Sequence, residues 1–304
     1  MESSLYRTDA PGDWGITQAP AGGKIGSERL TAPGRPDIFY RYWIVNAPAT
    51  LFILHGLGAH SGWFIDMGNA IAAKGINVFA MDHQGFGRSG GARGYVQSAQ
   101  EYLTDIDRMT DFIHHELPGT EIFLLGHSMG GVFAIQYAAD FQQKLGGVIL
   151  MNPWIADTAK LGLGSMLSIF VGGLFGSKEV VVLPDDRNPS GMTTNATAAE
   201  MLKQDPYWVS SRTKRFYYEI TLMRQKTMSQ AAKITIPLLT AQAEKDLAVS
   251  PAATKQAHDR IPAKDKTFKQ YANYAHDSEF EADRTELDGD IAQWILSHSA
   301  HKNH

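Results

Sequence analysis

One serine in this chain has the surroundings of a nucleophile. Ser128 is the central residue of Gly126-His-Ser-Met-Gly130, which matches the pattern G-x-S-x-G. The apolar run Ile122 to Leu125 precedes it, and a helical pattern extends from Ser128 to Phe141. On its own the pattern also occurs in plain turns, but between a buried strand and a helix it is typical of a serine held above the edge of a sheet. Glycines let the strand and the helix approach closely at such a strained turn.

Two main-chain N–H groups are candidates for binding the oxygen of a carbonyl that this serine attacks. Met129 is the first, because it stands at the start of a helix, where N–H groups are unpaired and the helix dipole is positive. Leu57 is the second, in the turn His55-Gly-Leu-Gly58 that follows the buried run Leu51 to Leu54. A strand that ends in such a turn supplies the other oxyanion donor in many hydrolases. His55 itself is expected to make structural hydrogen bonds rather than to act as a base.

A serine hydroxyl is a weak nucleophile that needs a base, and the base needs a carboxylate to orient it. His276 is the predicted base because it follows the strand-like run Thr267 to Tyr271 after a short loop. His258 lies within a helical pattern, and we expect it on a solvated face.

The orienting carboxylate is expected after the preceding strand-like run, Ile236 to Thr240. Glu244 and Asp246 both stand there, and Asp246 is the predicted acid with Glu244 as the alternative. Asp277 is adjacent to His276 in sequence, but successive side chains diverge, so Asp277 is not expected to orient it. The chain order serine, acid, histidine agrees with the order typical of this kind of nucleophile turn.

Strand-like and helical patterns alternate along most of the chain, which indicates βαβ units and a mostly parallel sheet. The alternation breaks between residues 153 and 234, a stretch that is helical in pattern and too long for a loop. The predicted fold class is therefore α/β: an α/β-hydrolase fold with a mostly parallel central sheet flanked by helices, and a helical cap inserted after the sixth strand. Residues 24–152 and 235–304 form the predicted core, residues 153–234 the cap or lid, and residues 1–23 a loose N-terminal arm.

Composition narrows the classes of protein and of site. The 304 residues include no cysteine, which excludes a thiol nucleophile, a disulfide scaffold and a cysteine zinc site. The formal charge of −4 comes without a basic cluster, so a nucleic-acid partner is not expected. No apolar leader or membrane span is recognisable, and we expect a cytoplasmic protein that is at most peripheral at a membrane. The segment Gly85 to Gly90 matches a dinucleotide pattern only formally, and neither an organic cofactor nor a metal is predicted.

An apolar stretch, residues 161–175, lies inside the predicted cap. It is expected to be either a buried cap helix or a lid that lines an acyl tunnel and makes transient contact with a membrane or micelle. Its glycines, each of which weakens a helix by about 1 kcal/mol, favour the lid. Ile169 and Phe170 are candidate substrate-binding residues in this stretch, and His60 and Trp63 are two more outside it. The oligomeric state is not predicted.

Together these residues resemble the monoacylglycerol lipase and lysophospholipase group of the α/β-hydrolases. Six segments between residues 38 and 280 carry the resemblance: His55-Gly-Leu-Gly-Ala-His-Ser-Gly62, Asp82-His-Gln-Gly-Phe-Gly-Arg-Ser-Gly90, Gly126-His-Ser-Met-Gly-Gly131, Asp205-Pro-Tyr207, Glu244-Lys-Asp246 and Tyr274-Ala-His276. The resemblance implies a triad of Ser128, Asp246 and His276 with Leu57 and Met129 as oxyanion donors. It also implies hydrolysis of the ester of a lipid with a single acyl chain.

The resemblance has one departure, beside the H-G-x-G turn. Monoglyceride lipases commonly carry a glutamate just after this turn and an arginine before the next aromatic residue. Ala59 and Trp63 stand at those positions here, so the resemblance does not extend to this polar contact for a glycerol head group.

Three classes of function remain in competition. The predicted one is a serine carboxylic-ester hydrolase that acts through an acyl-enzyme on a monoacylglycerol or lysophospholipid type of substrate. A serine peptidase of the proline-iminopeptidase type would use the same constellation, but it usually requires an acidic cap site for the substrate amine, which the sequence does not reveal. A non-catalytic binding protein on a hydrolase fold usually loses a member of the triad, whereas this chain retains all three.

Overall fold

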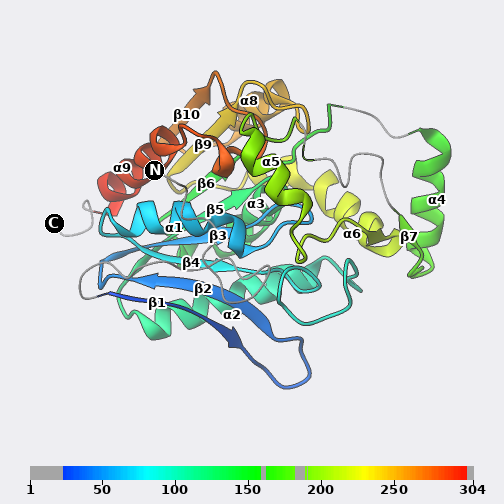
Figure 1. Ribbon diagram of the computed structural model, residues 1–304, viewed down its shortest axis with the longest axis horizontal. Helices are drawn as coiled ribbons and strands as arrows, with labels where there is room; N and C mark the ends of the chain where they lie inside the picture. Colours follow the sequence, from blue (N-terminus) through cyan, green and yellow to red (C-terminus); the bar gives the residue numbers. More distant parts are fainter. Residues whose placement is uncertain (1–22, 159–161, 182–188, 190, 300–304) are drawn as a thin grey trace.

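A sheet of eight strands forms the centre of the structure, a computed structural model that describes residues 23–158, 162–181, 189 and 191–299 (Figure 1). Its strands lie in the order β1-β2-β4-β3-β5-β6-β9-β10. Strand β2 is antiparallel to both of its neighbours, and the other pairings are parallel. The strands are β1 (Lys24–Leu30), β2 (Ile38–Ile44), β3 (Ala49–Leu54), β4 (Asn77–Met81), β5 (Glu121–His127), β6 (Gly147–Met151), β9 (Leu238–Ala243) and β10 (Lys266–Tyr271). The mostly parallel sheet predicted from the sequence is confirmed.

Helices cover both faces of this sheet (Figure 1). Successive side chains of a strand point to opposite faces. In β3, Leu51 and Ile53 join one buried cluster, with side chains of α1 and α9, while Phe52 and Leu54 join another, with side chains of α2 and α3. Because both faces are covered, the central strands are apolar at nearly every position. The flanking helices are α1 (Ile65–Ala72), α2 (Gln100–Glu116), α3 (Met129–Phe141), α8 (Pro251–Arg260) and α9 (Thr285–Ser299), with 3-10 turns η1 (Ser61–Phe64), η2 (Gln142–Lys144) and η3 (Ser278–Phe280).

The stretch between β6 and β9 is mainly helical in its described part. It contains the helices α4 (Leu163–Leu174), α5 (Ala196–Lys203), α6 (Lys214–Gln225) and α7 (Thr227–Ala231), and the antiparallel pair β7 (Val180–Val181) and β8 (Arg212–Thr213). Figure 1 shows α4 at the margin of the molecule, beyond α6 and away from the sheet. The short pair was not predicted, because strands of two residues leave no recognisable pattern. The division of the chain into a core and a cap stays a prediction.

Strand β1 was also missed by the sequence prediction. It lies at the edge of the sheet and pairs with β2 from Lys24↔Ile44 to Leu30↔Ile38. None of its side chains is fully buried, so its sequence shows no apolar run. The predicted N-terminal arm, residues 1–23, lies outside the described residues except for residue 23.

The turn between β5 and α3 is packed too closely for side chains on its glycines. A Cβ atom on Gly130 would lie 2.2 Å from the carbonyl oxygen of Leu54, and one on Gly126 would lie 2.2 Å from the carbonyl oxygen of Gly130. This close packing brings the start of α3 against the end of β3, next to which β5 runs in parallel. Ser128, between the two glycines, is therefore held at the carboxyl edge of the sheet.

The glycine packing predicts opposite effects of alanine at two helical positions. Gly130→Ala should lower the free energy of unfolding by about 1–3 kcal/mol or more, because its Cβ must displace backbone atoms. Gly289→Ala in α9 is the control: among the described residues, no heavy atom outside its own stretch of helix lies within 4 Å of its Cβ position, so the better helix propensity of alanine should raise stability by up to about 1 kcal/mol. Urea unfolding of both variants measures this, and equal effects would contradict the packing described here.

Candidate active site

Ser128 lies at a strained turn between β5 and α3. Its backbone has φ 52° and ψ −113°, a region that residues with a side chain rarely adopt. The carbonyl oxygen of Ser128 accepts hydrogen bonds from the N–H groups of Gly131 and Trp154 at 3.0 and 2.9 Å. Such strain persists only where the surrounding structure over-determines the backbone, which is common at functional sites.

The hydroxyl of Ser128 meets a histidine from the carboxyl end of β10. His276 Nε2 lies 2.9 Å from Ser128 Oγ, and His276 Nδ1 lies 2.8 Å from Asp246 Oδ2. All three side chains are buried. Because an ionised carboxylate only accepts hydrogen bonds, the neutral ring carries its proton on Nδ1, and Nε2 is left to accept the serine proton. The structure thus brings together the three residues predicted as nucleophile, acid and base.

The carboxylate beside His276 belongs to Asp246 and not to Glu244. The second oxygen of Asp246, Oδ1, accepts hydrogen bonds from the N–H groups of Ala248 and Val249, each at 2.9 Å. These bonds hold the carboxylate in one orientation in the loop after β9. Glu244 is exposed at the end of β9, so the structure favours the acid that was preferred from the sequence.

The environment of His276 raises its pKa above the ordinary value of a histidine. Burial alone would lower this pKa, but the charge of Asp246 and its hydrogen bond to Nδ1, together with the charge of Asp277, raise it. Burial in turn raises the pKa of the Asp277 carboxyl. A raised pKa makes His276 a stronger base, and it also means that the ring is protonated, and unable to accept the serine proton, over a wider range of acidic pH.

The two predicted oxyanion donors follow neighbouring strands in matching register. Leu54 of β3 pairs with Gly126 of β5, and Leu57 and Met129 each stand three residues further along the chain, beyond the ends of these strands. A Cβ atom on Gly56 would lie 3.1 Å from the Cβ of Ser128, so the turn after β3 lies against the nucleophile. Met129 is the first residue of α3, where the helix dipole favours negative charge. Their role as donors stays a prediction.

His60 and Trp63, predicted to bind substrate, both contact an aspartate of the inserted stretch instead. His60 Nε2 and Trp63 Nε1 each lie 2.8 Å from Asp205 Oδ2, and both side chains are buried. Asp205 follows α5, so these contacts tie the stretch between β6 and β9 to the turn after β3. His60 Nε2 and Trp63 Nε1 are thus engaged in this junction, and substrate binding by the two residues stays a prediction.

The two candidate residues on α4 differ in exposure. Ile169 is 7% exposed and packs in the same buried cluster as Phe216 and Tyr217 of α6. Phe170 is 50% exposed. The glycines of α4 have a packing role that the sequence prediction did not foresee, because a Cβ atom on Gly173 would lie 2.2 Å from Tyr218 of α6. Gly172 and Gly173 therefore allow α4 to pack closely on α6, whereas nothing lies within 4 Å of a Cβ atom built on Gly164 outside its own stretch of helix.

The outer face of α4 is apolar. Its exposed apolar side chains recur every three or four residues, which is the spacing of one face of a helix. They are Leu163, Met166, Leu167, Phe170, Val171 and Leu174, with Phe175 just beyond the helix. We call these seven side chains the α4 face. No helix in the described part of the chain is both long and apolar enough to cross a membrane.

Two further histidines have structural partners. His55 Nδ1 lies 2.7 Å from the carbonyl oxygen of Gly56, and Nε2 accepts a hydrogen bond from the N–H of His83 at 2.9 Å. Burial lowers the pKa of His55 to about 4. The prediction that His258 lies on a solvated face was wrong: it is buried, and its Nδ1 lies 3.0 Å from Thr240 Oγ1 of β9. A helical pattern does not show which face of α8 packs on the sheet.

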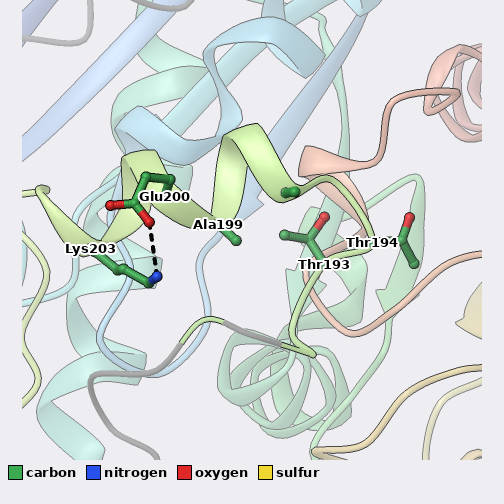
Figure 2. Close-up of a pocket in the computed structure, with 6 residues that line it drawn as sticks. Thr193, Thr194, Ala199, Glu200 and Lys203 are labelled. Carbon is green, nitrogen blue, oxygen red and sulfur yellow. Dashed lines mark hydrogen bonds and ion pairs between the residues drawn. The ribbon is translucent and has the colours of Figure 1, made fainter.

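A cavity of about 350 Å³ lies beside α5 (Figure 2). It is lined by Thr193, Thr194, Ala196, Ala199, Glu200 and Lys203. Figure 2 shows Glu200 and Lys203 paired with each other, and their charged atoms lie 2.9 Å apart. Thr194 is bonded through its N–H and hydroxyl to Glu281, behind the loop that carries His276. None of the residues that line this cavity belongs to the triad.

One group of side chains has the atoms of a metal site. In the described part of the chain, His127, His276 and Asp277 offer ligand atoms within 4.8 Å of one another. Both ring nitrogens of His276 are already bonded to Ser128 and Asp246, and His127 Nε2 lies 3.0 Å from the main-chain oxygen of His276. The nitrogens that would bind a metal are therefore engaged in hydrogen bonds of the triad and its loop.

Three residues with polar contacts around the candidate site were given no role by the sequence prediction. They are His127, Asn152 and Asp205, whose partners lie 149, 124 and 145 residues away along the chain. Asn152 directly follows one apolar strand run and His127 ends another, both at the edge of the sheet that holds Ser128. A polar residue at that position of a buried strand is the one signal in the sequence that points to them.

Several known proteins resemble this chain in sequence. Residues 46–283 match the family Hydrolase_4, described as serine aminopeptidase S33. The monoacylglycerol lipase of Mycolicibacterium smegmatis is 26% identical over 268 residues, which cover 87% of this chain and 95% of that protein. The monoglyceride lipase of Homo sapiens is 28% identical over 249 residues, 79% of this chain and 79% of that protein.

A solved structure has the same fold. A soluble variant of the monoglyceride lipase of Saccharomyces cerevisiae, in complex with a substrate analog, superposes with a TM-score of 0.81 at 18% identity. The superposition covers 95% of this chain and 99% of that one. The α/β-hydrolase fold predicted from the sequence is confirmed.

The raised pKa of His276 predicts how activity depends on pH. Because the base must be neutral, kcat/KM should be low in acid and should rise with pH through a midpoint above about 6.5, the ordinary value for histidine. Asp246→Asn removes the group that raises this pKa, so the midpoint should move to lower pH in the residual activity. Glu244→Gln, at an exposed carboxylate, is the control and should leave the midpoint in place. A wild-type midpoint below pH 6 would contradict the electrostatics described here.

Proposed function

The chain belongs to the Hydrolase_4 family of serine hydrolases, and from this we propose that it hydrolyses the carboxylic ester of a lipid with a single acyl chain. The observation that carries the proposal is the buried hydrogen-bonded chain from Ser128 through His276 to Asp246. Acyl transfer by serine needs this arrangement of a hydroxyl, a base and an orienting carboxylate.

In the first half of the proposed reaction, Ser128 Oγ attacks the ester carbonyl carbon while His276 Nε2 takes the hydroxyl proton. Negative charge develops on the carbonyl oxygen and is stabilised by the N–H groups of Leu57 and Met129. The bond to the alcohol then breaks, His276 returns the proton to the leaving alkoxide, and the acyl group stays on Ser128 as an ester. Asp246 stabilises the imidazolium throughout without taking its proton.

In the second half, water replaces the alcohol. His276 takes a proton from the water, whose oxygen attacks the acyl carbon of the Ser128 ester. The same two N–H groups stabilise the second oxyanion, and collapse of this intermediate breaks the bond to Ser128 Oγ. His276 returns the proton to the serine, and the products are a fatty acid and the restored enzyme.

The class of substrate is inferred from the relatives and from the α4 face. Monoacylglycerol or monoglyceride lipase is the name of relatives from both a bacterium and an animal. The α4 face supports a substrate that is delivered from a lipid phase, because exposed apolar patches of this kind commonly mark interaction sites. A monoacylglycerol or a lysophospholipid is therefore the proposed substrate.

A peptidase is the alternative that the family description favours, since it names a serine aminopeptidase. The same triad can cleave an amide, and only the site that recognises the substrate decides between the two activities. A panel of a monoglyceride, a lysophospholipid, a short acyl ester and an aminoacyl amide therefore separates ester from peptide hydrolysis.

The α4 face also suggests where the protein works. We infer that this face makes transient contact with a membrane or micelle, so that the protein acts as a peripheral lipid hydrolase. A cytoplasmic location is part of the same proposal, and it rests on the sequence alone.

Removal of the nucleophile tests the proposed reaction. Ser128→Ala should leave the melting temperature nearly unchanged and lower kcat on the preferred ester by roughly 10⁴- to 10⁶-fold, as triad substitutions generally do. The measurement is steady-state turnover on the four-substrate panel. Unchanged turnover by the alanine variant would overturn the assignment of Ser128, and exclusive cleavage of the aminoacyl amide would replace the esterase with the peptidase.

Polar substitutions on α4 test its contact with lipid. Leu167→Ser/Phe170→Ser removes two exposed apolar side chains, so partition to lipid vesicles should fall by roughly 10-fold or more, at about 1.5–3 kcal/mol for each fully buried side chain. Hydrolysis of long acyl esters in vesicles should fall with it, whereas hydrolysis of a short soluble ester should not. Ile169→Ser is the control, because its buried side chain should lower the melting temperature instead. Equal loss on short and long esters by the double variant would contradict the proposal.

A further inference from the structure

Asn152 sits between the loops that carry His276 and Asp246. It directly follows β6, its side chain has no exposed surface, and its backbone φ is 44°. Strand β6 pairs with β5, which leads into Ser128, and with β9, which leads into Asp246. Asn152 is therefore at the carboxyl edge of the sheet between the nucleophile strand and the acid strand.

Every hydrogen-bonding group of the Asn152 amide has a partner. Nδ2 donates to the main-chain oxygen of His276 at 2.6 Å and to Ser278 Oγ at 2.8 Å. Oδ1 accepts from the N–H of Ala243, the last residue of β9, at 2.7 Å. A side-chain amide offers two N–H donors and one carbonyl oxygen, so this single residue joins the base loop to the end of the acid strand.

The partners also explain why the residue is an asparagine. The main-chain oxygen of His276 can only accept, and the N–H of Ala243 can only donate. A carboxylate would face the His276 oxygen with a second acceptor. An apolar side chain would remove one donor to that oxygen and would take from the buried N–H of Ala243 the acceptor that Asn152 provides. Asparagine is in addition one of the few residues with a side chain that tolerates positive φ.

A second buried residue strengthens the hold on the same oxygen. His127 Nε2 lies 3.0 Å from the main-chain oxygen of His276, so His127 carries its ring proton on Nε2 and donates it. Its Nδ1 faces Glu279 at 3.6 Å. Burial lowers the pKa of His127 and raises the pKa of the Glu279 carboxyl, which favours the neutral form of both groups.

We propose that Asn152 is a positioning residue of the reaction: it fixes the loop of His276 against the end of β9 and so maintains the contact between His276 and Asp246. This proposal rests on the catalytic roles given above to Ser128, His276 and Asp246. Asn152 touches none of the reacting atoms. It acts through the backbone of His276. Displacement of a catalytic group by about 1 Å costs on the order of 10²-fold in rate, so a shift of this backbone would slow the reaction.

The chain offers a matched control in Asn77. This asparagine is also fully buried and also joins main-chain groups, accepting from the N–H of Val45 at 2.9 Å and donating to the oxygen of Ala47 at 2.8 Å. It is the first residue of β4, whereas Asn152 follows the last residue of β6. Asn77 therefore lies at the amino edge of the parallel sheet, the edge opposite the triad.

The experiment compares Asn152→Gly with Asn77→Gly on a short soluble acyl ester. Glycine accepts the φ of 44° at position 152, so loss of the side-chain hydrogen bonds is the main effect. Both variants should have a lower melting temperature. Only Asn152→Gly should lose kcat, by about 10- to 100-fold with little change in KM. Its pH midpoint should also fall, because His276 would lose part of its contact with Asp246.

The pH midpoint is a specific readout, since the groups that face His276 are known. They are Asp246 from the loop after β9, Asp277 of its own loop and His127 of β5, with Glu279 and Glu281 behind them. Only the contact with Asp246 is predicted to loosen in Asn152→Gly. Loss of folded protein, by contrast, lowers the amplitude of the activity and leaves the midpoint in place.

The outcomes separate failure of this inference from failure of the proposed reaction. If Asn152→Gly and Asn77→Gly keep equal kcat and equal midpoints, Asn152 is only structural and the inference is wrong. If Asn152→Gly does not fold, the isosteric Asn152→Asp decides by kcat alone, because it keeps the acceptor for Ala243 and loses the amide donors, whereas its carboxylate would itself raise the pKa of His276. Ser128→Ala, measured in parallel, keeps its activity only if the reaction itself was assigned wrongly.

Discussion

The hydrogen bond between His276 Nδ1 and Asp246 Oδ2, 2.8 Å long and buried, is the contact on which the candidate site depends. A charged carboxylate away from water needs several donors, and Asp246 has them in the ring of His276 and in two main-chain N–H groups of its own loop. The bond sets the tautomer of His276 and raises its pKa. Without it, the ring would have neither the orientation nor the basicity that a serine nucleophile requires.

The order of the strands in the sheet brings His276 and Asp246 close together. Strands β5, β6, β9 and β10 are parallel neighbours, so the loops at their carboxyl ends meet at one edge, where ligands of such sheets generally bind. Hydrogen bonds from residues behind the triad then hold the loops in place. Asn152 joins two of these loops, and Asp205 joins the inserted stretch to the turn after β3.

Much of the fold could be predicted because its signals are local in the sequence. The central strands are apolar on both faces, and the G-x-S-x-G motif stands between a strand and a helix that each have a clear pattern. The exposed edge strand β1 and the two-residue pair β7 and β8 lack such a signal. The candidate triad was recognisable because each member follows a strand-like run. The roles of Asn152 and His127 depend on contacts across more than a hundred residues, and no local pattern reveals such contacts.

The α4 segment shows that a glycine in the sequence can have a packing role that only the structure reveals. Its glycines suggested a weak and flexible helix, whereas Gly173 allows α4 to pack closely on α6. The apolar face that results is exposed because only one side of α4, including Ile169, is covered.

The most direct test of the account is where a reactive fluorophosphonate attaches to the wild-type chain. Mass spectrometry after protease digestion should find one phosphonate per chain, on Ser128, with labelling faster at pH 8 than at pH 5. The rate should fall strongly in His276→Ala, because the base is lost. Labelling of a different residue, or labelling of Ser128 at an undiminished rate without His276, would contradict the central claim that Ser128, His276 and Asp246 act as one unit.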